Sequence, residues 1–495
     1  MSPLLVFGII AGYFSLLIII SYFTSKDSSN KTFFTGNKQS PWFVVAFGMI
    51  GASLSGVTFI SIPGEVGSLI SEKEPYFKAF SYFQLVLGYL LGYFVIANVL
   101  MPMYYKLNLI SIYSYLSKRF GASTYKTGSL FFLLSQSMGA ALRLFLVAGV
   151  LQIAFFDAYG IPFILTVIIT ILLIWVYTFR SGIKTIVWTD TLQTFFMILS
   201  VVITIIIIYK ELNYTPRGLF STISEHEYTK IFFWDWKSSK FFFKQFFSGA
   251  FIAIVMTGLD QNMMQKNLTC RNINEAKKNM YWFSAILVPV NFLFLLLGFL
   301  LYMYANQKGI EIPLRSDDLY PILALKYFAP FVGIVFLLGI TAAAFSSADS
   351  ALTSLTTAFC VDFLKLDNKS EKNQKRSRLI VHVGFSIILL LIIVVFRIIN
   401  NDSVITAVFK VAGYTYGPLL GLYAFGLFTK IQVKDKWVPV VAILSPLISH
   451  VFKLYSSQII PGYHMGFEFL ILNGLVTFIG LLLIRKRNSD QILNS

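Results

Sequence analysis

The sequence predicts an all-α protein that crosses a membrane many times. Of its 495 residues, 56% are apolar and only 13% are charged, and the mean hydropathy is +0.72. Soluble domains carry roughly 25% charged residues, so this chain lacks the polar side chains needed to cover several water-soluble cores. This composition excludes a soluble enzyme, a disordered scaffold and a secreted disulfide framework, for which Cys270 and Cys360 are also too few.

Thirteen apolar runs are long enough to be membrane-spanning helices. A helix needs about 20 apolar residues to cross a hydrocarbon layer roughly 30 Å thick. The first run has no basic residue before it and no small-residue cleavage site after it, which predicts a retained helix rather than a signal peptide. The predicted spans are 3–23, 42–64, 78–104, 128–156, 162–179, 186–208, 244–264, 281–304, 329–355, 379–398, 405–428, 437–453 and 466–485.

The distribution of lysine and arginine predicts which side of the membrane each loop occupies. Most of these residues in short loops fall on one set of alternate loops, including 26–38, 106–126, 266–278, 365–378 and 485–487. Cytoplasmic loops carry such an excess, so the amino terminus is expected outside and the carboxyl terminus in the cytoplasm. This sidedness accounts for much of the net charge of +17 without a nucleic-acid partner.

The loops and the histidines argue against catalysis. The connections between the spans are too short for an attached nucleotide-binding domain, and the sequence contains no Walker-type glycine loop. A metal centre would need a cluster of ligands. We therefore expect no enzyme and no cofactor, a cell-membrane location, and a monomer or dimer in the lipid bilayer. The histidines are scattered, at His226, His382, His450 and His464.

Ionisable side chains inside spans indicate functional positions, because each costs roughly 2.5 to 3.5 kcal/mol to insert. Asp260 and Glu468 are near span ends, where we expect them to reach water. Lys410 is either functional or reaches water along its stem. The residues well inside the spans are Arg143, Asp190, Asp349 and Lys410.

One stretch of the ninth span predicts a cation site. Ser346, Asp349, Ser350 and Thr353 have the spacing of one helical face. Hydroxyl and carboxylate oxygens without imidazole or thiolate suit a hard cation. The alternative is that the serines bond to their own helix or help helices to pack.

The second span predicts a break in a membrane helix. Residues 48–58 contain three glycines and three hydroxyl side chains, and Pro63 follows. Glycine costs about 1 kcal/mol per residue relative to alanine in a helix, so an interruption that frees backbone carbonyls is favoured here. Small residues for close helix packing are the alternative.

Two further intramembrane charges have two interpretations each. Asp190 shares a helical face with Gln193 and either adds a carboxylate to the cation region or pairs with Arg143. Arg143 either holds the bundle together in a salt bridge or faces a cavity, where a guanidinium favours an anionic or hydroxyl-rich solute.

Several motifs, in order along the chain, resemble those of the sodium/solute symporter family, which includes sodium-coupled sugar, proline, pantothenate and sialic acid transporters. Each motif alone is weak, but their order and spacing on matching spans make the combination fairly specific. The matching segments are 51–63, 111–116 with 119–121, 188–190 with Gln193, 260–261 with 265–266, 346–350, and 417–421 with 426–428.

The resemblance implies a leucine-transporter-like core of two inverted five-helix repeats. The repeats would cover 42–209 and 244–428, joined by an external loop at 210–243. An extra amino-terminal helix and cytoplasmic loop would occupy 1–41. Two carboxyl-terminal helices and a tail would occupy 429–495.

The resemblance also implies site residues. A first sodium site would consist of backbone oxygens of Gly51, Leu54 and Ala343 with the hydroxyls of Ser346 and Ser347. Asp349 stands where the sialic acid transporter pattern has serine, so the second site would bind sodium, bind a proton or be vestigial. That second site would contain Asp190, Ser346, Asp349 and Ser350, and the solute would contact Ser53, Ser55, Thr58, Gln84 and Arg143.

The function implied is sodium-coupled symport of a small polar organic solute by alternating access. Sugars, sialic acid, amino acids and carboxylates all remain candidate solutes. A proton-coupled symporter is the nearest alternative, and a channel or transport-derived sensor is a more distant one.

Overall fold

A computed structural model describes residues 3–24, 40–71, 74–109, 111–178, 183–365, 370–399 and 403–486. The expected cytoplasmic loop at 25–39 lies outside these residues. The backbone of Asp349 is described as part of a helix, but its side chain is not.

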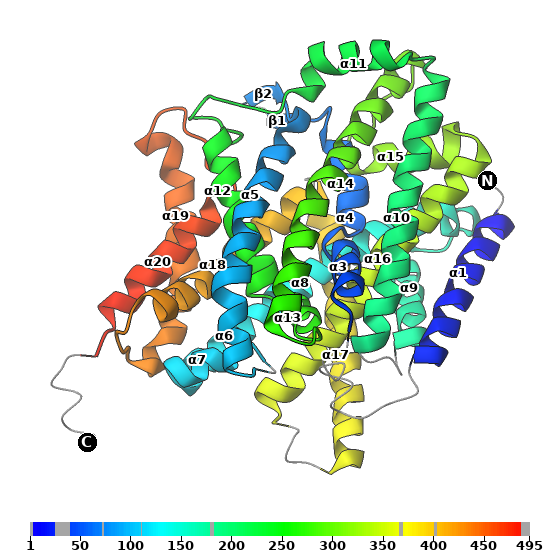
Figure 1. The fold of residues 1–495 in the computed structure, drawn as a ribbon. Coiled ribbons are helices and arrows are strands. Elements are labelled where there is room, and N and C mark those ends of the chain that lie inside the picture. The colour runs from blue at the N-terminus through cyan, green and yellow to red at the C-terminus, as the bar shows by residue number, and fades with distance from the viewer. Residues whose placement is uncertain are drawn as a thin grey trace.

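The amino-terminal half is a series of helices and one short hairpin (Figure 1). The hairpin strands β1 (Leu69–Ser71) and β2 (Glu74–Phe77) are antiparallel. A π-helical turn at Ile96–Leu100 connects α5 to α6. The helices are α1 (Pro3–Thr24), α3 (Trp42–Ser53), α4 (Gly56–Glu65), α5 (Tyr82–Val95), α6 (Met101–Lys106), α7 (Ser114–Arg119), α8 (Ala122–Ala154), α9 (Phe163–Thr178) and α10 (Ile183–Glu211).

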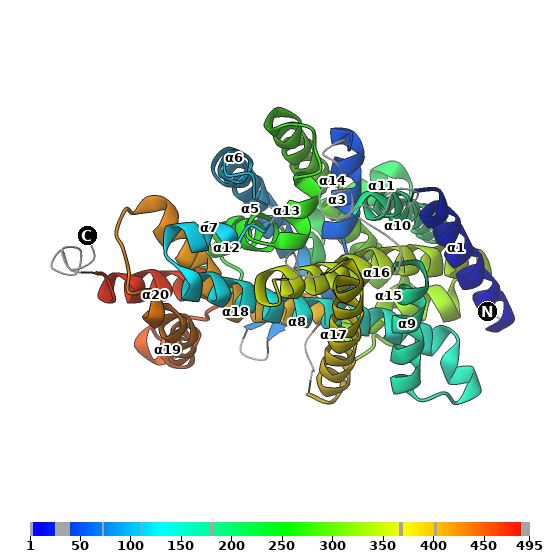
Figure 2. The same cartoon turned by 90° about the horizontal axis from the view of Figure 1, so that it is seen from below.

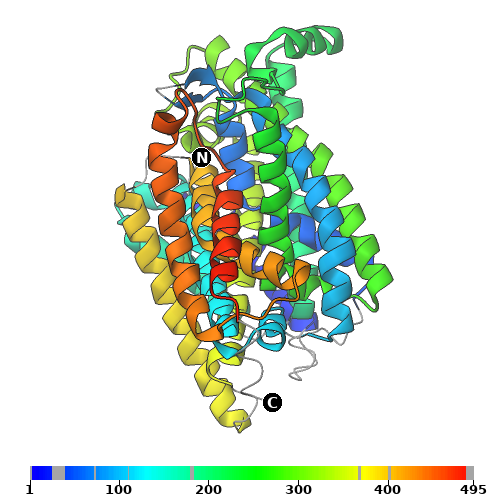
Figure 3. The same ribbon diagram turned by 90° about the vertical axis from the view of Figure 1, so that its left-hand side faces the viewer.

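The carboxyl-terminal half is also helical. Figure 3 shows its last two helices side by side on one flank of the bundle, and in Figure 2 α1 and α20 lie at opposite ends of the cross-section. The helices are α11 (Pro216–Glu225), α12 (Phe242–Ala253), α13 (Gln261–Asn267), α14 (Ile273–Gln307), α15 (Leu319–Ile322), α16 (Pro330–Ala358), α17 (Glu371–Ile399), α18 (Val404–Phe428), α19 (Val438–Ile459) and α20 (Phe469–Leu483).

The expected all-α membrane architecture is confirmed. In the described part of the chain, seven helices are long and apolar enough to cross a membrane, or nine if each of two bent pairs is one span. Shorter apolar helices lie within α1, α9 and α20. The count of thirteen crossings, the two repeats and the orientation of the termini remain predictions.

The first bent pair lies where the glycine-rich stretch predicts a break. α3 ends at Ser53, α4 begins at Gly56, and the two axes differ by 53°. Leu54 donates its amide to Ile50 O at 2.7 Å, and Ser55 is extended with φ −82° and ψ 178°. Helix ends leave carbonyls without helical partners, so this break exposes backbone oxygens inside the bundle.

The second bent pair was not expected from the sequence, which predicts one uninterrupted span over 244–264. α12 continues through a π-helical turn to Gly258, and α13 then leaves at an angle of 71°. The reason is a helix start at Asp260, whose Oδ1 accepts a hydrogen bond from Met263 N at 3.1 Å. A carboxylate in this position satisfies a free amide of the new helix and so favours its start there.

A buried carboxylate holds the start of α18 to the end of α4. Glu65 accepts hydrogen bonds from the Ser403 hydroxyl and from Thr406 Oγ1, the latter at 2.6 Å. The same carboxylate pairs with Lys78 Nζ at 2.7 Å. These contacts join two helices that border the cavity described below.

A second buried carboxylate at the start of α18 predicts a pH-dependent stability. Asp317 Oδ2 accepts a hydrogen bond from Val404 N at 2.8 Å, and burial raises the pKa of Asp317 from 3.8 to about 6. An acid whose pKa is higher in the folded chain binds its proton more tightly there, so stability increases as the pH falls from above 6 toward 4.

We expect Asp317→Asn to remove this dependence while still accepting the bond from Val404 N. The difference of about two pKa units corresponds to roughly 3 kcal/mol. The measurement is the melting temperature of both proteins in detergent between pH 4 and 7. Wild-type and variant curves that stay parallel over that range would contradict the assignment.

Candidate ion and solute site

A fully buried carboxylate joins three helices at the centre of the bundle. Asp190 of α10 accepts a hydrogen bond on Oδ1 from Ser346 Oγ of α16 at 2.5 Å. Its Oδ2 lies 2.6 Å from Lys266 Nζ of α13. The sequence left open whether Asp190 pairs with Arg143. The structure pairs it with Lys266 instead.

The position of Lys266 corrects the interpretation of the sequence. Lys266 belongs to the motif 265–266, and its place after the predicted span 244–264 predicts a cation in a cytoplasmic loop. In the structure its side chain is 1% exposed, because α13 turns back into the bundle after Asp260. Asp260, which the sequence predicts to extend into water from the end of a span, is likewise buried, at 3% exposure.

The break after α3 lies close to this carboxylate. Gly51 packs against α10 so tightly that a Cβ at this position would lie 2.0 Å from Thr194 Oγ1 and 3.2 Å from Asp190 O. Glycine is therefore required here for the backbones to approach. The freed carbonyls that follow Ile50 are thus held near the helix that carries Asp190.

The residues expected for the first sodium site lie on elements that pack together. α16, with Ala343, Ser346 and Ser347, contacts both α3, which contains Gly51, and α4, which begins shortly after Leu54. Ser347 Oγ donates to Ala343 O at 3.3 Å, and Ser346 Oγ donates to Asp190. A hydroxyl that donates its proton keeps oxygen lone pairs available for a cation.

The second expected ion site is already linked to a protein cation. Asp190 and Ser346 are in contact with each other, and Ser350 is buried on the same helix. The side chain of Asp349 lies outside the described residues. Lys266 occupies one oxygen of Asp190, which no sequence pattern predicts.

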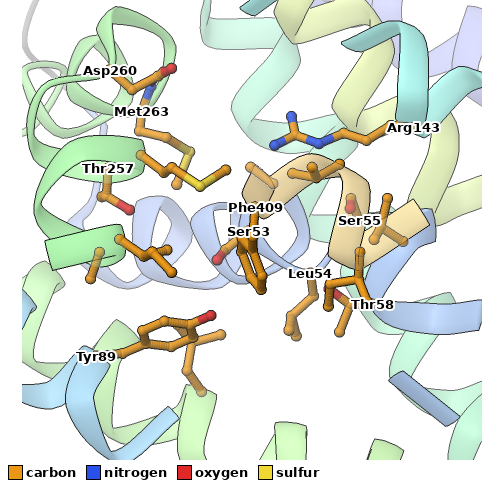
Figure 4. Close-up of a pocket in the computed structure, with 18 of the residues that line it drawn as sticks. Ser53, Leu54, Ser55, Thr58, Tyr89, Arg143, Thr257, Asp260, Met263 and Phe409 are labelled. Atoms are coloured by element: carbon orange, nitrogen blue, oxygen red, sulfur yellow. Dashed lines mark hydrogen bonds between the residues drawn. The ribbon is translucent and has the colours of Figure 1, made fainter. Parts of the chain in front are cut away.

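A cavity opens beside the break between α3 and α4. It contains about 870 Å³ of space outside the atoms, part of it open to solvent. Both interrupted helices and four further helices, α5, α8, α14 and α18, contribute to its wall. Figure 4 shows part of this lining. The lining includes Ser53, Leu54, Ser55 and Thr58 at the first break, Asp260, Asn262 and Met263 at the second, Tyr82, Tyr89 and Tyr93 of α5, Gln136 and Arg143 of α8, and Tyr416 of α18.

Opposite charges face this cavity from two sides. In Figure 4, the guanidinium end of Arg143 points toward the side from which Asp260 projects. Asp260 Oδ2 accepts a hydrogen bond from Tyr416 Oη at 2.7 Å. Among the described residues, no carboxylate lies within 4.0 Å of Arg143, so the salt bridge that would hold the bundle together is not present.

The other expected solute contacts divide into two groups. Ser53, Ser55 and Thr58 line the cavity together with Arg143. Gln84 does not line it: its Nε2 donates to Lys240 O at 2.9 Å and its Oε1 accepts from Phe233 N at 3.2 Å. We assign Gln84 to the support of the loop before α12 and leave it out of the proposed solute site.

The remaining intramembrane charges lie away from the cavity. Lys410 is exposed on the surface of α18. Glu468 lies near the start of α20, where Lys244 Nζ is 3.9 Å away and Tyr463 Oη donates to it at 3.1 Å. Neither side chain lines the cavity.

A polar cavity between two interrupted membrane helices, one of them beside a buried carboxylate, defines a solute carrier of the secondary transporter class. Residues 33–434 match the model of the sodium:solute symporter family, and the chain belongs to that family.

Known transporters agree in sequence and fold. The sodium/sialic acid symporter of Aliivibrio fischeri is 25% identical over 427 residues, which cover 84% of this chain and 81% of that one. The sodium/sialic acid symporter of Proteus mirabilis is 23% identical over 446 residues, covering 86% and 84%. A solved structure of a substrate-bound, outward-open Na⁺-coupled sialic acid symporter matches with a TM-score of 0.80 at 19% identity, covering 97% and 98%.

Proposed function

We propose that this chain is a sodium-coupled symporter of a small solute that carries a carboxylate and several hydroxyl groups, and that it works by alternating access. One observation carries the proposal. The break between α3 and α4 contributes side chains to the cavity that contains Arg143, and its backbone lies beside the helices of Asp190 and Ser346.

The proposed ion ligands suit sodium. The carbonyls of Gly51, Leu54 and Ala343 and the hydroxyls of Ser346 and Ser347 supply hard oxygen donors. Sodium bound between the break and α16 would order the break. Ser53, Ser55 and Thr58 belong to the same short segment, so an ordered break also forms the solute cavity.

The proposed solute follows from the charge in the cavity. Among the described residues, no carboxylate lies at salt-bridge distance from the Arg143 guanidinium. We propose that this guanidinium binds a solute carboxylate with two parallel hydrogen bonds. The hydroxyls and Gln136 around it suit an oxygen-rich body. The two relatives reported above are named for sialic acid, which has both features.

Coupling requires that sodium and solute strengthen each other's binding. By linkage the two effects on affinity are equal, whichever ligand binds first. One sodium ion balances the charge of a singly ionised solute, so the transported pair is neutral and the sodium concentration gradient supplies the driving force. A tenfold sodium gradient contributes about 1.4 kcal/mol, which is sufficient for roughly 10-fold accumulation of the solute. Proton coupling through Asp190 has less support, because Lys266 already compensates that carboxylate.

A melting-temperature screen tests the proposal. N-acetylneuraminate, lactate, proline and glucose are added to the purified protein in sodium chloride or in choline chloride at the same pH. We expect stabilisation by a carboxylate solute in sodium chloride and a much smaller shift in choline chloride. Equal stabilisation in both salts would contradict sodium coupling, and stabilisation by glucose alone would contradict the role of Arg143.

A further inference from the structure

The Lys266 side chain places its ammonium group 2.6 Å from Asp190 Oδ2, where the family resemblance implies a second ion. We propose that Lys266 is a tethered cation that fills the second site at Asp190 and Ser346, so that transport is coupled to one sodium ion. This inference rests on the proposed function, because only a sodium-coupled carrier has a sodium count.

The pair of Lys266 with Asp190 differs from the other ion pairs of the described residues. Its two side chains are 1% and 0% exposed, whereas the members of the other two pairs are 10–16% exposed. Both Asp190 oxygens are used, since Oδ1 accepts from Ser346 Oγ and Oδ2 lies 2.6 Å from Lys266 Nζ. Asp190 is therefore buried, hydrogen-bonded and paired with a protein cation.

A sodium ion cannot share this carboxylate with the ammonium at low cost. A cation on either oxygen of Asp190 would stand a few ångströms from Lys266 Nζ, in surroundings where charge repulsion is screened far less than in water. Displacing the ammonium instead would leave a buried charge without Asp190, which is strongly unfavourable. The tethered cation therefore excludes the free one.

The position of Lys266 on α13 connects the tethered cation to the solute cavity. Asp260 caps the start of α13, and Asp260, Asn262 and Met263 line the cavity. Lys266 lies near its other end, where Thr269 Oγ1 donates to Lys266 O at 2.7 Å. A free ion would leave this position in each cycle, whereas the ammonium keeps α13 joined to α10 and α16 throughout.

Counting bound radioactive sodium on the purified protein tests the inference without knowledge of the solute. We expect one sodium per wild-type molecule at saturation. Lys266→Gln frees Asp190 and should bind two, and adding Asp190→Asn to that variant should return the count to one. Lys266→Arg keeps a tethered cation and should bind one.

Lys106→Gln is the matched control, because Lys106 is an exposed lysine at the end of α6, and it should bind one sodium. Two sodium ions bound to the wild type would overturn this inference but not the proposed function. That result does not depend on the folding of any variant. A single sodium on folded Lys266→Gln would also overturn it. No bound sodium on the wild type would overturn both this inference and the proposed function.

Discussion

Replacing both Ser346 and Ser347 by alanine should raise the sodium concentration for half-maximal uptake by about 100-fold. Each hydroxyl contributes about 1.4 kcal/mol to sodium binding, close to the value for a hydrogen bond to a charged group, and two such losses give this factor. Ser346 Oγ also donates to Asp190, so its loss leaves a buried carboxylate oxygen without that donor. The measurement is solute uptake into proteoliposomes over a range of sodium concentrations at fixed pH.

Ser354→Ala is the control for that double variant. Ser354 lies on the same helix, is 2% exposed and donates to Ala351 O at 2.9 Å. It therefore tests the effect of removing a buried serine hydroxyl from α16 at a distance from the proposed ion ligands. An unchanged sodium response in the double variant would remove Ser346 and Ser347 from the ion site.

Replacing Arg143 by glutamine should weaken solute binding by about 100-fold and leave sodium binding intact. A guanidinium forms two parallel hydrogen bonds with a carboxylate, and losing a charged, desolvated partner costs several kcal/mol, of which about 2.7 kcal/mol gives this factor. Arg143→Lys keeps the charge but not the paired donors, so it should restore only part of the affinity.

The control for Arg143 is Arg397→Gln. Arg397 is an exposed arginine in the last turn of α17 and stacks over Phe163, outside the solute cavity. Solute affinity is measured by the concentration dependence of the melting temperature in saturating sodium. An affinity for the solute that is equal in Arg143→Gln and wild type would exclude Arg143 as the carboxylate-binding residue.

The break between α3 and α4 is predictable from the sequence, and a cavity-facing Arg143 is one of the two positions that the sequence leaves open. Glycines at 48, 51 and 56 weaken a helix wherever they occur together, and this local effect is readable along the chain. Arg143 is conspicuous because a charge inside an apolar run has a high insertion cost. Ser53, Ser55 and Thr58 belong to the same interrupted segment, and the family resemblance implies that they contact the solute.

The second break and the ion pair of Lys266 require the fold. Lys266 follows an apolar run and has the pattern of a loop cation, so only the bend at Asp260 reveals that it returns to the core. A helix-start signal is present, because Asp260 follows Gly258 and precedes a new helix, but one carboxylate in an apolar region has several interpretations. Gln84 is a residue that the family resemblance places in the solute site and the fold places elsewhere. Its amide group forms hydrogen bonds with the backbone of the loop before α12.

Uptake driven by a sodium gradient tests the central claim most directly. Proteoliposomes loaded with potassium chloride are diluted into sodium chloride or choline chloride at one pH, with the radiolabelled solute identified by the melting-temperature screen. We predict that sodium drives transient accumulation above the external concentration and that choline does not. Equal uptake in choline and sodium would show that no sodium gradient powers this carrier.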